Sequence, residues 1–257
     1  MDKNGIYFSL ADEKSYFSSG RHIHEAIEIY YLTGGICHYF IDGEPYTLAA
    51  GYTVIVPSGV IHRTNYGSAT HSRYLLNIPR EYIPSEVISS AFALGYLFDT
   101  RADGVPKRLF DKIAEEYERG DELSPRLIGC YATELLAHLA RSKCSVESVG
   151  EKNAANRAVK YVKEGYSGEI SLTSLAARLG ITPEHLSRSF KAQTGFGFNE
   201  YLTLLRLRHA EIMLHNEPGR SVGEIAYAVG FNDSNYFSKR FKEIYGTSPT
   251  AVRKKKK

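Results

Sequence analysis

Residues 225–253 constrain this chain more than any other part of the sequence. Apolar residues at helical spacing end at Gly230, a polar turn follows, and a second helix is predicted over residues 234–242. Two short helices joined by a tight turn are typical of a helix-turn-helix, whose second helix enters the major groove of DNA. This stretch therefore predicts a DNA-reading element.

The predicted second helix has one apolar face and one polar face. Phe237, Phe241 and Ile244 are spaced i, i+4 and i+7, so we expect them to face the core. The other face carries hydrogen-bonding groups and cations, the kinds of side chain that contact base edges and phosphates. These outer residues are Ser234, Asn235, Ser238, Lys239 and Lys242.

The same pattern occurs once before in the chain. The run Leu-Ala-x-x-x-Gly that ends at Gly180 returns as Ile-Ala-x-x-x-Gly at Gly230, 50 residues later. The run Phe-Lys-x-x-x-Gly that ends at Gly195 returns at Gly246, 51 residues later. The difference of one residue falls in the turn, where an insertion is tolerated. A repeat of a whole helix-turn-helix predicts two units of one kind.

The first unit contains its own recognition helix. Thr182 is a capping residue and Pro183 suits a first turn, so together they predict a helix over residues 184–191. Alignment of the repeats places Arg188 level with Lys239. We predict that Arg188 contacts a base, because arginine is the commonest bidentate partner of guanine; a phosphate contact or a solvated face is the alternative. The outer residues of this helix are Glu184, Ser187, Arg188 and Lys191.

Residues 199–215 are predicted to form one long helix that connects the two units and holds their spacing rigid. Arg206 in this helix can contact a phosphate or pair with a nearby acidic side chain, and the sequence does not separate these roles. Ser221-x-x-Glu224 is a capping box, so the first helix of the second unit is expected to begin there.

These residues give the chain a resemblance to the AraC/XylS family of transcription regulators. The resemblance implies binding to double-stranded DNA and control of promoters with RNA polymerase as a partner, most often as an activator and often in carbohydrate metabolism. It also implies homodimers that pair through helices of a sensor domain. Val252 departs from the family, which usually has an aromatic residue there. The matching signature is Ile225-Ala226-x-x-x-Gly230-Phe231-x-Asp233-x-Asn235-Tyr236-Phe237-x-Lys239-x-Phe241-Lys242-x-x-x-Gly246-x-Ser248-Pro249-x-x-x-Arg253.

The charge of the chain is divided unevenly. Residues 151–257 hold 18 Lys or Arg and 10 Asp or Glu, whereas residues 1–150 hold 14 and 19. A basic C-terminal part is the electrostatic footprint of a phosphate-binding domain. The polar stretch 145–153 is the predicted linker between the two parts, and residues 254–257 are a predicted basic tail.

The length of 257 residues allows about two domains. The sequence has no long apolar run and no basic-then-apolar N-terminus, so we expect a cytoplasmic protein that does not interact with a membrane. Cys37, Cys130 and Cys144 are far apart, which predicts buried free thiols and neither a disulfide framework nor a zinc site.

Residues 21–75 are predicted to form short β-strands separated by Gly and Pro turns, with Asp42-Gly43 as a strong hairpin signal. This half resembles a cupin, which implies a small β-barrel. The two matching motifs are His22-x-His24-x-x-x-Glu28 with Gly35, and Gly51 with Pro57-x-Gly59-x-x-His62.

Strand alternation gives the first motif a physical meaning. His22, His24 and Glu28 have equal parity, so they point to one side of an extended strand, and Tyr30 shares that side. If that side is the barrel interior, His22, His24 and Glu28 converge with His62, and three imidazoles with one carboxylate form a first shell for a divalent transition metal. The same groups equally suit the lining of an effector pocket or a structural hydrogen-bond network. The 19 tyrosines also make a sugar-type effector conceivable, since aromatic faces stack on sugar rings.

Residues 107–119 and 125–143 are predicted to form amphipathic helices. Their leucines either pack against the barrel or form a contact between two copies of the chain. We expect at least one of the two helices to contribute to a homodimer interface.

The predicted fold is α+β. It combines a cupin-like β-barrel with helices in residues 1–144, for effector binding and dimerisation, with an all-α double helix-turn-helix domain in residues 154–253. The predicted function is that of a sequence-specific DNA-binding transcription regulator, more an activator than a repressor, that responds to a small-molecule effector. We expect no catalytic activity. The rival hypothesis is a metal-dependent cupin enzyme with a DNA-binding appendage, which rests only on the four candidate metal ligands.

Overall fold

The computed structural model describes residues 5–11, 26–66, 70–142, 144–146 and 153–254. The chain forms two compact units. One unit holds Met1–Ile41 and Pro45–Val149, and the other holds Gly150–Lys257 together with Asp42–Glu44.

The strands of the first unit form two sheets. The six-stranded sheet has the order β1-β7-β2-β5-β8-β9, and the three-stranded sheet has the order β4-β3-β6. The turn between β3 and β4 is the predicted Asp42-Gly43 pair, and both residues have positive φ (48° and 91°), as a tight hairpin turn requires. The strands are β1 (Tyr7–Ala11), β2 (Ile27–Gly34), β3 (Ile36–Ile41), β4 (Glu44–Ala49), β5 (Tyr52–Val56), β6 (His62–Asn65), β7 (Ser72–Ile78), β8 (Leu97–Asp99) and β9 (Ser145–Val146).

Strand β2 separates two hydrophobic clusters, because successive side chains of a strand point to opposite faces. Ile27 and Ile29 contribute to a cluster shared with the helices of this unit. Tyr30 and Leu32 contribute to a second cluster, which also contains Tyr39 of the three-stranded sheet. The six-stranded sheet is therefore the middle layer of the unit.

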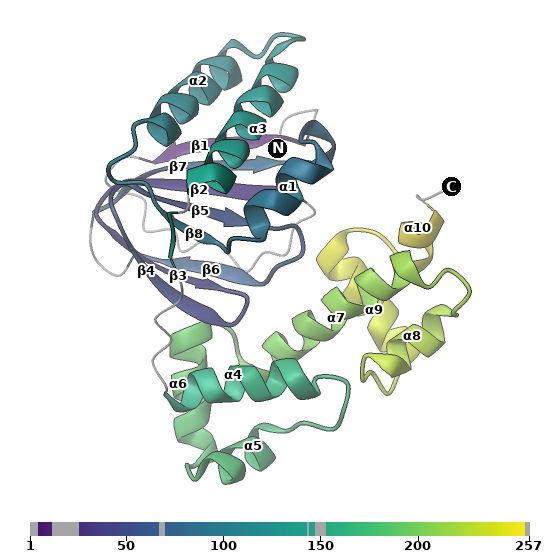
Figure 1. Ribbon diagram of the computed structural model, residues 1–257. Coiled ribbons are helices and arrows are strands. Elements are labelled where there is room, and N and C mark those ends of the chain that lie inside the picture. The colour runs from purple at the N-terminus through teal and green to yellow at the C-terminus, as the bar shows by residue number, and fades with distance from the viewer. Residues whose placement is uncertain (1–4, 12–25, 67–69, 143, 147–152, 255–257) are drawn as a thin grey trace. The chain divides into compact units, whose positions relative to one another are not determined.

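Three helices cover the outer face of the six-stranded sheet: α1 (Ser85–Phe92), α2 (Val105–Arg119) and α3 (Ser124–Ser142). In Figure 1, α2 and α3 lie across this sheet, and β3, β4 and β6 lie on its other side. Leu135, Leu136 and Leu139 of α3 are fully buried in the cluster under the helices. These leucines are therefore core residues of the single chain.

Three strands fall outside the sequence prediction. β1 lies before the predicted β region, and β8 has only three residues, too few to show a period. β9 comprises the first two residues of the predicted linker, which pair with β8 in the register Leu97↔Val146 and Phe98↔Ser145. Pairing with a distant strand decides these segments, and local sequence does not encode it.

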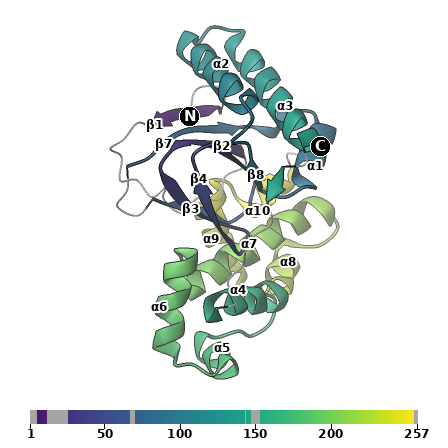
Figure 2. The same ribbon diagram turned by 60° about the vertical axis from the view of Figure 1, so that its left-hand side comes forward.

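The second unit is all helical. Figures 1 and 2 show α4, α5 and α6 grouped around the start of α7, and α8, α9 and α10 around its other end. The helices are α4 (Ala154–Gly165), α5 (Leu172–Leu179), α6 (Pro183–Thr194), α7 (Phe198–Asn216), α8 (Val222–Ala228), α9 (Ser234–Tyr245) and α10 (Pro249–Lys254). The predicted pairs α5–α6 and α8–α9 are confirmed as two helix-turn-helix units joined by α7.

The ends of these helices are set by side chains that the sequence predicts. Ser221 and Glu224 form the expected capping box at the start of α8. Val252, which departs from the family pattern, is buried and packs in the core of the second helix-turn-helix. None of the helices in the described ranges is both long and apolar enough to cross a membrane.

Candidate functional sites

The recognition helices α6 and α9 begin in the same way. The Thr182 hydroxyl accepts a hydrogen bond from the backbone N–H of His185 at 3.2 Å. The Asp233 carboxylate accepts two, from the N–H groups of Asn235 (2.7 Å) and Tyr236 (3.0 Å). Such caps satisfy N–H groups that have no partner inside the helix. They fix the residue at which each helix begins.

Buried side chains fix the rotation of both helices. Leu186 and Phe190 of α6 are fully buried, and so are Phe237 and Phe241 of α9. Each pair has i, i+4 spacing, and the two pairs are 51 residues apart. The opposite face of each helix is consequently turned to solvent.

The structure places the predicted DNA-contacting residues on these outer faces. The Ser238 hydroxyl donates to the Ser234 carbonyl oxygen at 2.9 Å, so toward DNA it is better placed to accept a hydrogen bond than to donate one. Arg240, two residues after Ser238, is half-buried and pairs with Glu243 at 2.5 Å. Lys239 is therefore the exposed cation next to Ser238 on the outer face of α9. The exposed residues are Glu184, Ser187, Arg188, Lys191, Asn235, Lys239 and Lys242, and Ser234 and Ser238 are half-buried.

Two further residues share a position on the recognition helices that sequence reasoning missed. His185 and Tyr236 are each the third residue of their helix, and both are exposed. The Tyr236 side chain is 51% exposed, and its ring lies 6.1 Å from that of Phe231. Residues near the start of a recognition helix commonly contact bases. The alignment of the repeats, which places His185 level with Tyr236, was the signal available.

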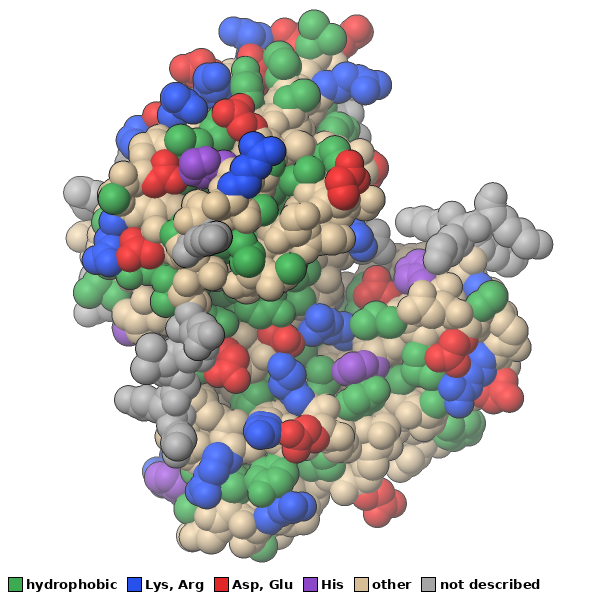
Figure 3. Space-filling model, viewed as in Figure 1, with side chains coloured by type: hydrophobic (Ala, Val, Ile, Leu, Met, Phe, Trp, Pro, Cys, Tyr) green, Lys and Arg blue, Asp and Glu red, His purple; other side chains and the backbone are tan. Residues whose placement is uncertain are grey.

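Basic side chains of the second unit extend beyond the recognition helices. Figure 3 shows Lys and Arg side chains over α4 and α5 on the face turned to the viewer. Arg178 of α5 lies over the ring of Tyr161 of α4, with 4.3 Å between the guanidinium carbon and the ring centroid. Such charges attract the phosphate backbone without regard to sequence.

A buried polar cluster occupies the interior of the first unit. The Tyr39 hydroxyl donates a hydrogen bond to the Glu28 carboxylate. The Nε2 atom of His62 lies 3.4 Å from Glu28 Oε2, and its Nδ1 atom lies 2.8 Å from the Val60 carbonyl oxygen. Glu28 belongs to the six-stranded sheet, and Tyr39 and His62 belong to the three-stranded one. The cluster therefore ties the two sheets together.

The protonation of this cluster follows from its surroundings. Burial lowers the pKa of His62, but the neighbouring Glu28 carboxylate outweighs it and leaves that pKa raised. Burial, followed by the charge of Glu28, raises the pKa of Tyr39 well above its usual value. Tyr39 is thus a neutral donor, and His62 with Glu28 forms a buried ion pair when His62 is protonated.

Tyr30 lies beside this cluster. Its ring meets that of Tyr39 edge-on, with 5.4 Å between the centroids. Burial, with Cys37 and Tyr66 adding to it, raises the pKa of Tyr30, and burial raises the pKa of the Cys37 thiol to about 12. These groups are neutral at physiological pH and offer hydrogen bonds, and the Cys37 thiol is unreactive.

The structure brings together Glu28, Tyr30 and His62 of the predicted sensor residues. His22 and His24 lie outside the described residues. Among the residues that are described, no three His, Cys, Asp or Glu side chains are arranged to hold a metal ion. Glu28 contacts both Tyr39 and His62, an arrangement that suits a structural network or an effector lining.

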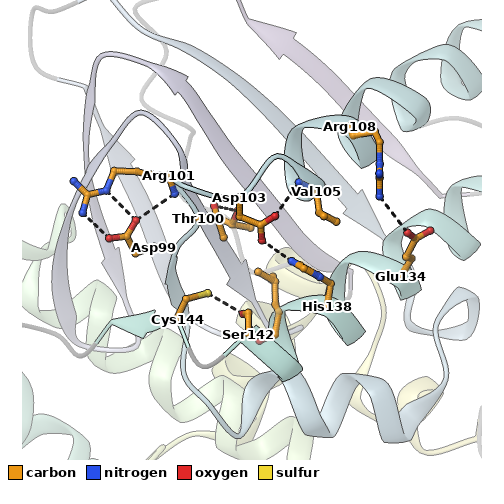
Figure 4. A network of polar contacts seen from close by, with 12 residues as sticks. Asp99, Thr100, Arg101, Asp103, Val105, Arg108, Glu134, His138, Ser142 and Cys144 are labelled. Carbon is orange, nitrogen blue, oxygen red and sulfur yellow. Dashed lines mark hydrogen bonds and ion pairs between the residues drawn. The ribbon is translucent and has the colours of Figure 1, made fainter.

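A second polar network joins α3 to the loop after β8, as Figure 4 shows. The Nε2 atom of His138 lies 2.5 Å from Asp103 Oδ2. The other oxygen of Asp103 accepts the backbone N–H of Val105 at 2.9 Å, at the start of α2. The Ser142 hydroxyl lies 2.8 Å from the Cys144 sulfur, just before β9. The network holds the end of α3 beside the sheet edge.

Two families match the chain. The family described as "Helix-turn-helix domain" matches residues 175–255, and the family described as "Cupin domain" matches residues 12–76. These ranges fall on the second unit and on the strands of the first. A cupin domain joined to a double helix-turn-helix defines a two-domain DNA-binding transcription regulator.

Relatives agree with this class. The Msm operon regulatory protein of Streptococcus mutans is 31% identical over 119 residues, which cover 46% of this chain and 41% of that protein. The chain thus spans less than half the length of this relative. The HTH-type transcriptional activator RhaS of Citrobacter koseri is 25% identical over 90% of this chain and 86% of its own length. The two family matches confirm the predicted helix-turn-helix and cupin domains, and the chain is similar to transcription regulators of the AraC type.

Solved structures that match the chain include the C-terminal domain of AraT, a response regulator from Geobacillus stearothermophilus. It is 32% identical, with a TM-score of 0.39, and covers 40% of this chain and 86% of its own. ToxT from Vibrio cholerae O395 covers 98% of both chains at 13% identity, with a TM-score of 0.40.

Proposed function

We propose that this protein binds promoter DNA with α6 and α9 and changes that binding when its first unit takes up a small molecule. One observation carries the DNA half of the proposal. Two helices of equal length, 51 residues apart, each have a side-chain cap, a buried i, i+4 pair and an exposed polar and basic face. A single such helix is common in proteins, whereas this repeated design suits the reading of two DNA segments.

Each helix would enter one of two neighbouring major-groove segments about one helical turn, or ~34 Å, apart. Arg188 and Lys239 occupy equivalent positions on the outer faces and would contact base edges. Lys191 and Lys242, one turn further along the same helices, would contact phosphates. Both arrangements use only side chains that are exposed in the structure.

The effector would bind in the first unit near Glu28, Tyr30 and His62. Their carboxylate, phenol and imidazole can exchange hydrogen bonds with a hydroxylated ligand, and tyrosine faces can stack on a sugar ring. A sugar is therefore the proposed class of effector. To act as a switch it must bind one arrangement of the regulator more tightly than another.

Regulation would take place in the cytoplasm on a homodimer, with activation of RNA polymerase at the promoter. α3 is the proposed dimer helix, because it lies on the outer layer of the first unit and presents Cys130 and Glu134 to solvent. RhaS carries the name of an activator, which supports activation over repression.

The test is selection of bound duplexes from a random DNA pool at a stated, near-physiological salt concentration, since affinity for DNA depends strongly on salt. Enrichment of two boxes with centres about 10 base pairs apart is expected. Adding candidate sugars should then alter affinity for that duplex or its footprint. The DNA proposal fails if no sequence is enriched under any of these conditions.

A further inference from the structure

The turn that follows α4, residues 166–168, contacts the second helix-turn-helix. The Tyr166 ring stacks on the His209 ring of α7, with centroids 3.9 Å apart and planes 8° apart. Tyr166 also packs against the hydrophobic cluster that contains Phe237 and Phe241 of α9. Tyr166, which directly follows α4, is thus packed against the core of the second helix-turn-helix.

Arg206 of α7 fastens the same turn. Its Nε donates to the Tyr166 carbonyl oxygen at 2.7 Å, and its Nη2 donates to the Gly168 carbonyl oxygen at 2.9 Å. From the sequence, Arg206 could contact a phosphate or pair with an acidic side chain. In the structure its Nε and Nη2 groups instead donate to backbone carbonyl oxygens. The planar guanidinium suits two parallel hydrogen bonds of this kind.

On the side of the second helix-turn-helix, Gly230 completes this contact. It lies between α8 and α9 with φ +95°, a conformation that other residues rarely adopt. A Cβ atom there would lie 2.8 Å from the Ser167 carbonyl oxygen and 2.9 Å from the Cζ and Nε atoms of Arg206. The turn of the second helix-turn-helix therefore approaches both the 166–168 turn and the guanidinium as closely as a glycine permits.

We propose that residues 166–168, Arg206 and Gly230 form a joint that sets the distance and angle between α6 and α9. Arg206 and Gly230 are then positioning residues for recognition of two DNA boxes. The inference rests on the proposed function and extends it from base contacts to box spacing.

The argument is mechanical. α7 by itself is a single connection, and long helices bend. α4 packs on α5 and α6 of the first helix-turn-helix, so a turn fixed at the end of α4 carries the position of those helices. Fastening this turn to α7 and to Gly230 adds a second connection between the two helix-turn-helix units. Two connections resist rotation of one helix-turn-helix relative to the other, whereas α7 alone would allow it.

The consequence concerns spacing. Two linked modules gain roughly 10²–10⁴ in affinity when both bind at once, and this gain is lost when geometry prevents it. A rigid joint confines the gain to one box spacing, whereas a loose joint shares it among several. Loosening should therefore lower the preference for the selected spacing while each helix keeps its own box.

The experiment uses the full chain and the duplex obtained by selection. Affinity is measured for that duplex, for versions with the boxes one base pair closer or further apart, and for a duplex with a single box. Arg206→Met keeps the length of the side chain but cannot donate. It should reduce the preference for the selected spacing by about tenfold, with single-box affinity within about twofold of wild type.

Two further variants and one control sharpen the result. Arg206→Lys can reach one carbonyl, so its spacing preference should be intermediate. Gly230→Ala pushes on the same contacts and should resemble Arg206→Met. Arg220→Met is the matched control, because Arg220 forms a surface pair with Glu217 at 3.0 Å and should leave the spacing preference unchanged.

The outcomes separate the inference from the function beneath it. Wild type that prefers two boxes, with Arg206→Met and Gly230→Ala keeping that same spacing preference, would overturn the joint and leave the proposed function standing. Wild type that binds one and two boxes equally would overturn both. Equal weakening on every duplex, including the single box, would make Arg206 a general structural residue and also overturn the proposal.

Discussion

The Nε2 atom of His62 lies 3.4 Å from Oε2 of Glu28, and both side chains are buried in the first unit. The folded pKa of His62 is raised above its usual value of about 6.5. This contribution to stability is fully present below the unfolded pKa and is lost as pH rises through the folded pKa. The melting temperature of the first unit should consequently fall as pH rises above about 6.5.

His62→Gln is the variant that tests this relationship. It should remove this part of the pH dependence, because glutamine does not titrate. His38→Gln is the control, since His38 is exposed and contacts Thr47 at 3.2 Å. A melting profile of wild type that is flat over this range, or unchanged in His62→Gln, would contradict the assignment.

The core of the second helix-turn-helix supplies a stability prediction. Phe241 is fully buried against Phe237 and Tyr245, with ring centroids 5.7 Å and 4.5 Å away. Phe241→Ala should cost about 3–5 kcal/mol in the free energy of unfolding of this unit. Ile212→Ala, at a side chain 45% exposed, should cost under about 0.5 kcal/mol. Hydrogen exchange of the α9 amides reports the difference, and equal protection in both variants would show the helix rotation to be wrong.

The caps give a graded prediction. Asp233 accepts two backbone N–H groups and Thr182 accepts one. Each replacement by alanine should cost about 1 kcal/mol, with Asp233→Ala the more costly. Asn232→Ala, in the exposed turn beside Asp233, is the control. Denaturant titration measures all three, and a cost for Asn232→Ala as large as that for Asp233→Ala would argue against capping.

The helical half was predictable because its information is local. Thr182 and Ser221 cap their helices in the structure as the sequence implies, and Gly180 ends α5 as predicted. Apolar spacing alone placed Phe237 and Phe241 in the core. Each of these features depends on residues within one or two turns of one another.

The rest depends on contacts between distant residues. Val146 joins the sheet only because Leu97 lies opposite it. Arg206 found its partners 40 and 38 residues away in the backbone of residues 166 and 168, which no side-chain pattern encodes. Tyr236 was assigned to neither face of its helix from the sequence, and the structure shows its side chain to be 51% exposed.

Tyr236 gives a prediction of its own. Because the ring is half exposed near the start of α9, Tyr236→Ala should leave folding unchanged and weaken binding to the selected duplex by about 1–3 kcal/mol. Tyr236→Phe separates a hydroxyl hydrogen bond from an apolar contact. Tyr227→Ala, at a side chain 60% exposed on α8, is the control. Equal effects of Tyr227→Ala and Tyr236→Ala would remove Tyr236 from the reading face.

The central claim is that both helices read sequence, and the most direct measurement is DNA selection repeated with Arg188→Ala and with Lys239→Ala. Each variant should lose about 1–3 kcal/mol of sequence preference at positions in one box only. The box affected by Arg188→Ala should be a different one from the box affected by Lys239→Ala. If either variant weakens all sequences equally, or if both affect the same box, two-helix reading of DNA is contradicted.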